Sequence, residues 1–216
     1  MSTKQIYWQI MKSNIIEFEK FAIKTDRDVF SPREDVEIFP KALKNIIREK
    51  SKILELGTGT GAISISVAKN FKDVTITATD INLSALKIAR YNAKINKVDN
   101  IIKFKESNWF SNIQTERYDF IITNPPYLEK KNSGFYMELS DPENSLYATN
   151  KGLDDIYKII RLGVNFLKKN SYIIIEHSHN QTLALKEYSA RYKLQLIKSE
   201  KDSLGLNRVS IFSNSI

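Results

Sequence analysis

The chain has 216 residues, of which 42% are hydrophobic, with no cysteine and a formal net charge of +8. A chain of this length buries about 70% of the surface that its unfolded form exposes, so disorder is excluded as its main state and one domain is expected. The lack of cysteine excludes disulfides, thiolate metal sites and cysteine nucleophiles, and it fits the cytoplasm, where we expect this protein.

The positive charge is spread along the chain rather than gathered in one stripe. Lysine supplies 25 of the 33 basic residues, whereas side chains that read phosphates and bases tend to be arginine. Residues 101–150 reverse the sign, with seven acidic and five basic groups. The charge pattern therefore favours a solvated, lysine-rich surface over a nucleic-acid-binding face.

The first 30 residues are expected to form a short helical extension before a domain over residues 31–216. Apolar side chains between residues 5 and 23 recur at near-helical spacing. Charged residues interrupt this stretch well short of the ~20 apolar residues that a membrane span requires. We therefore expect a helix packed on the domain and no membrane attachment.

Short β-branched runs alternate with amphipathic stretches along the rest of the chain, and this alternation predicts a mostly parallel, seven-stranded sheet with helices on both faces. The last two runs predict a C-terminal hairpin that adds one antiparallel strand. The stretch 124–151 lacks periodicity, and a loop of that length is usually functional. The expected strands are Lys52–Leu56, Val74–Asp80, Ile101–Lys105, Tyr118–Thr123, Tyr172–Glu176, Gln195–Ser199 and Arg208–Phe212. The expected helices are Ala62–Asn70, Leu83–Asn96 and Leu153–Lys168.

The first predicted strand runs into a glycine-rich turn, residues 55–61, directly before a helix. Its three glycines allow the backbone to approach a ligand closely, although the third comes one residue too early for a nicotinamide-binding turn. Asp80 ends the next strand, where a carboxylate can accept both hydroxyls of a ribose. Asp80 could instead start the following helix, but the glycine turn upstream favours the ribose.

The most specific motif is Asn124-Pro125-Pro126-Tyr127, at the end of the fourth predicted strand. The Asn124 amide oxygen and the Pro125 carbonyl provide two acceptors held side by side, and Tyr127 provides a planar face. Such acceptors suit an NH₂ group on a planar carbon, either an amide or the exocyclic amine of a base. By fixing both N–H bonds they can aim the nitrogen at an electrophile, which is catalysis by positioning.

Together these residues resemble class I S-adenosylmethionine-dependent methyltransferases that modify amino groups, and more narrowly the HemK/PrmC family of release factor glutamine methyltransferases. The resemblance implies a Rossmann-like fold, with residues 31–216 as the methyltransferase domain. The narrower match rests on Ser31–Glu37, Asp141-Pro142, Ser145-Leu146, Gly152–Asp154, Glu176–Gln181 and Asp202–Val209.

The resemblance also implies roles for individual residues. The glycine turn would line the methionine end of S-adenosylmethionine, Asp80 would hold its ribose, and Trp109 would lie against its adenine. The implied cofactor-binding residues are Glu55, Gly57, Thr58, Gly59, Thr60, Gly61, Asp80, Ile81, Asn108, Trp109 and Asn124. The implied substrate-binding residues are Asn124, Pro125, Pro126 and Tyr127, with Asn124, Pro125 and Tyr127 catalytic.

The implied reaction is N5-methylation of the glutamine in the Gly-Gly-Gln motif of peptide-chain release factors, without a metal. The chain departs from the family pattern in two places. Only about 30 residues precede the core, so an accessory chain could replace the family's N-terminal helical domain in gripping the release factor. Ser178 also replaces a glycine, between His177 and His179. This histidine pair lacks a third metal ligand, and we expect no metal.

Two other functions remain open. The same Asn-Pro-Pro-Tyr chemistry would serve an exocyclic amino group of RNA or DNA, adenine N6 or guanine N2. The acidic excess around the proposed acceptor site disfavours nucleic acid, because a groove for phosphates should carry the opposite sign. A cofactor-binding module without activity is the third reading, and the intact methyl-transfer motif disfavours it.

Overall fold

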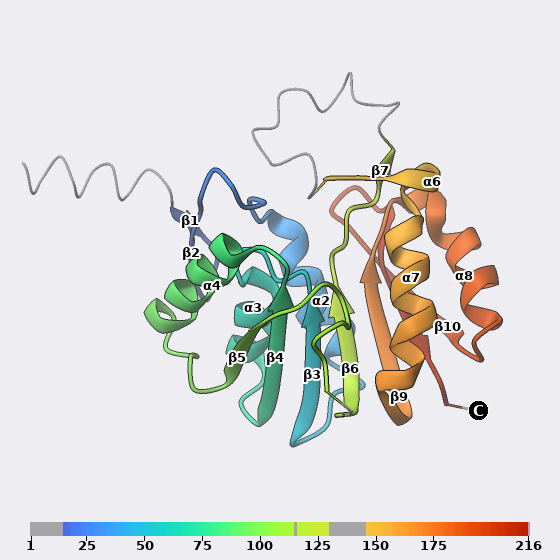
Figure 1. The fold of residues 1–216 in the computed structure, drawn as a ribbon, viewed down its shortest axis with the longest axis horizontal. Helices are drawn as coiled ribbons and strands as arrows, with labels where there is room; N and C mark the ends of the chain where they lie inside the picture. The colour runs from blue at the N-terminus through green and yellow to red at the C-terminus, as the bar shows by residue number, and fades with distance from the viewer. Residues whose placement is uncertain (1–14, 115, 130–145, 216) are drawn as a thin grey trace, which may run out of the picture.

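The structure, a computed structural model, describes residues 15–114, 116–129 and 146–215. Its centre is a seven-stranded sheet in the order β10-β11-β9-β6-β3-β4-β5 (Figure 1). Within it, β11 alone runs in the opposite direction to the other six strands. The predicted fold class is thereby confirmed, and each predicted strand is present to within a few residues. The strands are β3 (Ser51–Leu56), β4 (Val74–Asp80), β5 (Ile102–Glu106), β6 (Tyr118–Thr123), β9 (Leu167–Glu176), β10 (Gln195–Lys201) and β11 (Asn207–Ser213).

Helices cover both faces of the sheet, because neighbouring residues of each strand point to opposite sides. Ile53 of β3 packs with α2 (Ile38–Leu43), α3 (Ala62–Asn70) and α4 (Leu83–Ile95). Leu54, the next residue, packs on the other face with α7 (Asp154–Gly163) and α8 (Thr182–Ala190). The same alternation holds along β6 and β9, so the central strands are apolar on both sides.

The N-terminal prediction was wrong for the part that the structure describes. Residues 15–24 form an antiparallel hairpin of β1 (Ile15–Glu17) and β2 (Ala22–Lys24), and residues 1–14 lie outside the described chain. The backbone of β2 pairs with side chains of α4: Asn92 Oδ1 accepts from the Lys24 N–H at 2.9 Å, and Asn96 Oδ1 from that of Ala22 at 3.1 Å. A local helical period cannot reveal these distant partners, which stabilise an extended backbone.

Several other elements differ from the expected ones. The helix expected to reach Lys168 ends at Gly163, and a short 3₁₀ turn, Val164–Phe166, leads into β9. The patterns assigned no element to α2, α8 or the 3₁₀ turns Glu34–Glu37 and His179–Gln181. From the stretch 124–151, β7 (Leu128–Glu129) and β8 (Tyr147–Ala148) form a small parallel pair, α6 (Thr149–Gly152) follows, and residues 130–145 lie outside the described chain.

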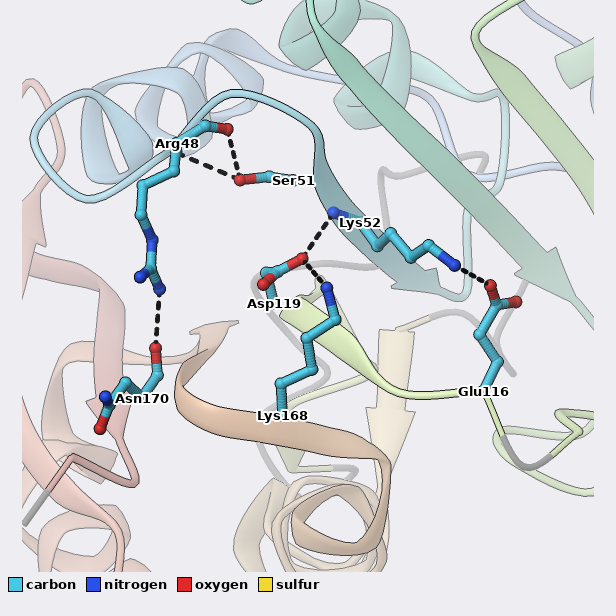
Figure 2. Close-up of polar contacts among 7 residues, drawn as sticks. All are labelled: Arg48, Ser51, Lys52, Glu116, Asp119, Lys168 and Asn170. Carbon is cyan, nitrogen blue, oxygen red and sulfur yellow. Dashed lines mark hydrogen bonds and ion pairs between the residues drawn. The ribbon is translucent and has the colours of Figure 1, made fainter.

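Polar contacts join the strands at the amino end of the sheet, as Figure 2 shows. Asp119 Oδ2, on β6, accepts from the Lys52 backbone N–H at 2.8 Å and from Lys168 Nζ at 2.6 Å, linking β3 and β9. The Lys52 side chain also pairs with Glu116 at 2.6 Å. These charges lie at the surface in pairs of opposite sign.

The carboxyl ends of β3, β4 and β6 meet at the opposite edge, where the arrowheads in Figure 1 point. The chain crosses from β3 outward to β4 and β5 and then returns to β6 on the other side of β3. Open α/β sheets bind ligands at such a switch point. The glycine turn follows β3, Asp80 ends β4 and the Asn-Pro-Pro-Tyr motif follows β6, so the topology brings the three together.

Candidate active site

A cavity of about 590 Å³ lies at this edge of the sheet. Its size suits a cofactor-sized ligand. Two predicted cofactor residues, Glu55 and Gly61, are not part of its wall. The predicted site residues that line it are Gly57, Thr58, Gly59, Thr60, Asp80, Ile81, Asn108, Trp109, Asn124, Pro125, Pro126 and Tyr127.

The glycine turn has a left-handed backbone at each of its three glycines. Gly57 and Gly59, with φ of +69° and +54°, expose their backbone to the cavity. Gly61, with φ of +83°, instead brings α3 against α4, since a Cβ there would lie 3.1 Å from the Ala89 Cβ. The third glycine therefore serves helix packing, whereas the first two form the cavity wall.

Glu55 lies behind the turn and is fully buried. Its Oε2 accepts hydrogen bonds from the Thr58 hydroxyl at 2.6 Å and from the Ser64 hydroxyl. Burial raises the pKa of Glu55 to about 7, against the lowering effect of these hydrogen bonds. Glu55 thus braces the turn and the start of α3 rather than lining the cavity.

Asp80 joins the glycine turn to the end of β4. Its Oδ2 accepts from the Gly59 N–H and its Oδ1 from the Asn82 N–H, both at 2.8 Å. Burial raises the pKa of Asp80, opposed by these backbone hydrogen bonds. The helix-start role belongs to Asn82, whose side chain accepts from the N–H groups of Ser84 and Ala85. Asp80 itself remains in the cavity wall.

Trp109 lies in the turn after β5 with a left-handed backbone, φ +51°. The Ser107 hydroxyl fixes this turn by donating to the Trp109 carbonyl at 2.7 Å. Asp155, in the first turn of α7, lies near the Trp109 side chain. Burial raises the pKa of Asp155, and the neighbouring Trp109 side chain opposes that rise. Asp155 also lines the cavity, and no sequence motif pointed to it.

Tyr127 is held by groups from three other segments. Its hydroxyl donates to Glu176 Oε1 at 3.0 Å, and its carbonyl accepts from Gln181 Nε2 at 3.1 Å. Gly152 packs so closely that a Cβ there would lie 1.9 Å from the Tyr127 carbonyl oxygen. Burial, and then the neighbouring Glu176, raise the pKa of Tyr127 above its usual range. The phenol is therefore a neutral donor whose orientation is fixed.

A partly buried charged cluster lies beside the Tyr127 hydroxyl. Burial, and then Asp35, raise the pKa of Glu176 to about 8. Arg208 Nη2 donates to Asp202 Oδ2 at 2.9 Å, and its Nε lies 4.0 Å from Asp35 Oδ2. These residues belong to three segments that carried the family resemblance without an assigned role. Their joint position explains why such distant segments accompany one motif.

The two histidines after β9 lie in different surroundings. His177 is buried, with Nε2 2.7 Å from the Ser210 hydroxyl and Nδ1 2.8 Å from the Ser178 carbonyl. Burial lowers its pKa, so it is neutral at pH 7. His179 lines the cavity. Within the described residues, no three histidine, aspartate or glutamate side chains gather as metal ligands, and no helix is long and apolar enough to span a membrane.

Solved structures share this architecture. A methyltransferase from Pyrococcus furiosus superposes with a TM-score of 0.71 at 20% identity, covering all of both chains. TYW2 from M. jannaschii, solved in complex with AdoMet, has a TM-score of 0.60 at 18% identity, covering 92% of this chain and 84% of that one. A family model described as "Methyltransferase small domain" matches residues 20–138. The fold and this match define a Rossmann-like methyltransferase domain.

Curated relatives narrow the class. The release factor glutamine methyltransferase of Fusobacterium nucleatum is 33% identical over 206 residues, which cover 93% of this chain and 58% of the relative. That of Buchnera aphidicola is 34% identical over 198 residues, covering 90% of this chain and 71% of the relative. The chain belongs to the release factor glutamine methyltransferase family.

Proposed function

We propose that this chain transfers a methyl group from S-adenosylmethionine to the side-chain amide nitrogen of the glutamine in the Gly-Gly-Gln motif of a peptide-chain release factor. The observation that carries the proposal is one cavity shared by two motifs. The glycine turn with Asp80 lines it from one side, and the stretch 124–127 lines it from the other. Membership of the family supports the choice of acceptor.

The residues at the first side fit S-adenosylmethionine. The backbone of Gly57 and Gly59 is open to the cavity, and an added Cβ on Gly57 would contact the Trp109 ring at 3.7 Å. This cradle would take the methionine end, the Asp80 carboxylate would accept from the ribose hydroxyls, and Trp109 would face the adenine. The cofactor supplies an electrophilic methyl group on a sulfonium.

The residues at the second side fit a carboxamide. The Asn124 side-chain oxygen and the Pro125 carbonyl would accept the two N–H bonds of the glutamine amide. This matters because the lone pair of an amide nitrogen is delocalised, and holding both N–H bonds aims the nitrogen and favours its rehybridisation. Tyr127, fixed by Glu176 and Gln181, would hold the plane of the amide. Catalysis is then by positioning and electrostatics.

Transfer of label from tritiated S-adenosylmethionine tests the acceptor. Purified release factor, total RNA and total DNA are incubated separately with the enzyme. We expect label in the release factor and none in the nucleic acids. Label confined to nucleic acid would overturn the proposal in favour of an exocyclic-amine methyltransferase, and absence of cofactor binding would overturn it altogether.

A further inference from the structure

The turn between β10 and β11 presents two leucines beside the Tyr127 end of the cavity. Leu206 lines the cavity, together with Arg208 from the same hairpin. Leu204 stands further out and is 81% exposed, the highest value among the large hydrophobic side chains of the described residues. A single exposed leucine is ordinary, but one continuous with a site wall extends that wall outward.

The turn that carries these leucines is built to hold its shape. Asp202 Oδ1 accepts from the N–H groups of Leu204 at 3.0 Å and Leu206 at 2.9 Å. Asp202 Oδ2 accepts from Arg208 at 2.9 Å, and the Gly205 N–H donates to the Asp202 carbonyl at 3.0 Å. One nearly buried carboxylate therefore fixes the turn and links it to the charged cluster around Tyr127. Preorganisation of this kind lowers the entropic cost of binding a partner.

Two further leucines line the same cavity. Leu128 lies in β7, and Leu146 lies directly before β8. Arg208 is the basic residue of the hairpin that lines the cavity, and its charge is balanced by Asp202 and Asp35. Leucines beside a charge-balanced arginine suit an uncharged stretch of polypeptide better than a nucleic-acid backbone.

We propose that the β10–β11 turn is a docking surface for the polypeptide loop that carries the methylated glutamine. Leu206 contacts the residues next to that glutamine at the cavity mouth, and Leu204 contacts the protein substrate further from it. This inference rests on the proposed function, since it takes the acceptor to be a protein. It assigns a substrate-recognition role to a hairpin that lies about 80 residues after the Asn-Pro-Pro-Tyr motif in the sequence.

The test compares Leu204→Ser with Ile197→Ser in steady-state methylation of intact release factor. Ile197 is a matched control because it is also exposed, at 54%. It lies near the start of β10, toward the amino end of the sheet and away from the β10–β11 turn. Loss of one interface anchor raises KM by about fivefold or more. We expect that increase for Leu204→Ser with kcat nearly unchanged, no change for Ile197→Ser, and wild-type cofactor affinity in both.

The outcomes separate this inference from the proposed function. A wild-type enzyme that binds cofactor but does not methylate release factor would overturn the proposed function. A wild-type enzyme that methylates release factor, with equal KM values for Leu204→Ser and Ile197→Ser, would overturn the docking surface alone. Leu206→Ser provides a second test. Because Leu206 lies at the cavity mouth, its loss should raise KM more than the loss of Leu204 does.

Discussion

Acidic side chains at the two ends of the central sheet have pKa values shifted in opposite directions. At the amino end, Glu116 lies at the surface, and a hydrogen bond from Lys52 lowers its pKa. At the carboxyl end, burial raises the pKa of Glu55 and Glu176 to about 7 and about 8. Surface pairs join strands at little cost, whereas buried carboxylates with raised pKa reduce stability at neutral pH. Such groups concentrate where a protein binds or reacts.

The largest effect expected at the carboxyl end is on catalysis. Asn124→Ala removes one of the two proposed acceptors for the amide N–H bonds while leaving the glycine turn and Asp80 in place. Methyl transfer should fall by about 10²–10³-fold, as for loss of a preorganised polar group, with cofactor affinity largely retained. Transfer rates and cofactor titration measure the two quantities separately.

The control for that variant comes from the other end of the molecule. Asn165→Ala changes an exposed asparagine in the 3₁₀ turn before β9. Its transfer rate should match that of the wild type. Equal rates for both variants would show that the Asn124 side chain takes no part in the reaction.

A second prediction concerns the glycine that packs on Tyr127. Gly152→Ala would place a Cβ 1.9 Å from the Tyr127 carbonyl oxygen in a backbone with φ of +79°. We expect a loss of about 2–4 kcal/mol in the free energy of unfolding, from overpacking added to backbone strain. Transfer should fall as well, because the stretch 124–127 must shift. Urea unfolding and transfer rates check both effects.

Gly205→Ala isolates the strain from the overpacking. Gly205 has φ of +78°, and a Cβ there meets nothing within 4 Å. Gly205→Ala should lower the free energy of unfolding by about 1 kcal/mol, from backbone strain alone. If both variants lost the same stability, the close contact between Gly152 and Tyr127 would be refuted.

The third prediction concerns how the free energy of unfolding depends on pH, which should differ between Glu176 at the carboxyl end of the sheet and Glu116 at the amino end. The pKa of Glu176 is about 8 in the folded chain and near 4.5 in the unfolded chain, so the folded state binds more protons between these values. Stability therefore falls as pH rises through this window. Relative to Glu176→Gln, the wild type should lose about 1–3 kcal/mol between about pH 5.5 and about pH 8.5, measured by urea unfolding.

At the amino end, the pKa of Glu116 is shifted in the opposite direction to that of Glu176, and Glu116→Gln serves as the control. The pKa of Glu116 is lowered, so its contribution is present above its unfolded pKa and is lost only as pH falls below that value. Its unfolding free energy should therefore run parallel to that of the wild type across the same window. A Glu176→Gln curve that also ran parallel would mean that Glu176 is ionised at the site.

The smallest effect on activity is expected from Asp119→Ala. This change removes the acceptor for the Lys52 N–H and for Lys168, which link β6 to β3 and β9 (Figure 2). Stability should fall by about 1–2 kcal/mol, and the transfer rate should stay at the wild-type value. A large loss of activity without unfolding would break the division between a structural end and a functional end.

Much of the fold could be predicted because it depends on local pattern. Runs of β-branched residues bounded by turns gave the strands, and parallel strands bring their carboxyl ends to one edge. The glycine turn, Asp80 and Asn124 each follow such a strand, so their convergence followed from the topology. The N-terminal hairpin could not be predicted, because Asn92 and Asn96 hold β2 from about 70 residues away.

Other parts of the site escaped prediction for related reasons. Glu55 belongs to the same motif as the cavity glycines, and only its burial shows that it faces Thr58 and Ser64. Asp155 gave no signal, since an aspartate in the first turn of a helix is ordinary. The cluster of Asp35, Glu176 and Arg208 joins residues more than 170 positions apart, although three motifs of the family resemblance marked its members.

We propose that the site at the carboxyl ends of β3, β4 and β6 methylates a glutamine side chain. The most direct measurement is a mass spectrum of the release-factor peptide containing the Gly-Gly-Gln motif, before and after incubation with enzyme and S-adenosylmethionine. We predict a gain of one methyl group on the glutamine side chain with the wild type and none with Asn124→Ala. An unchanged peptide alongside methylated RNA or DNA would contradict the claim.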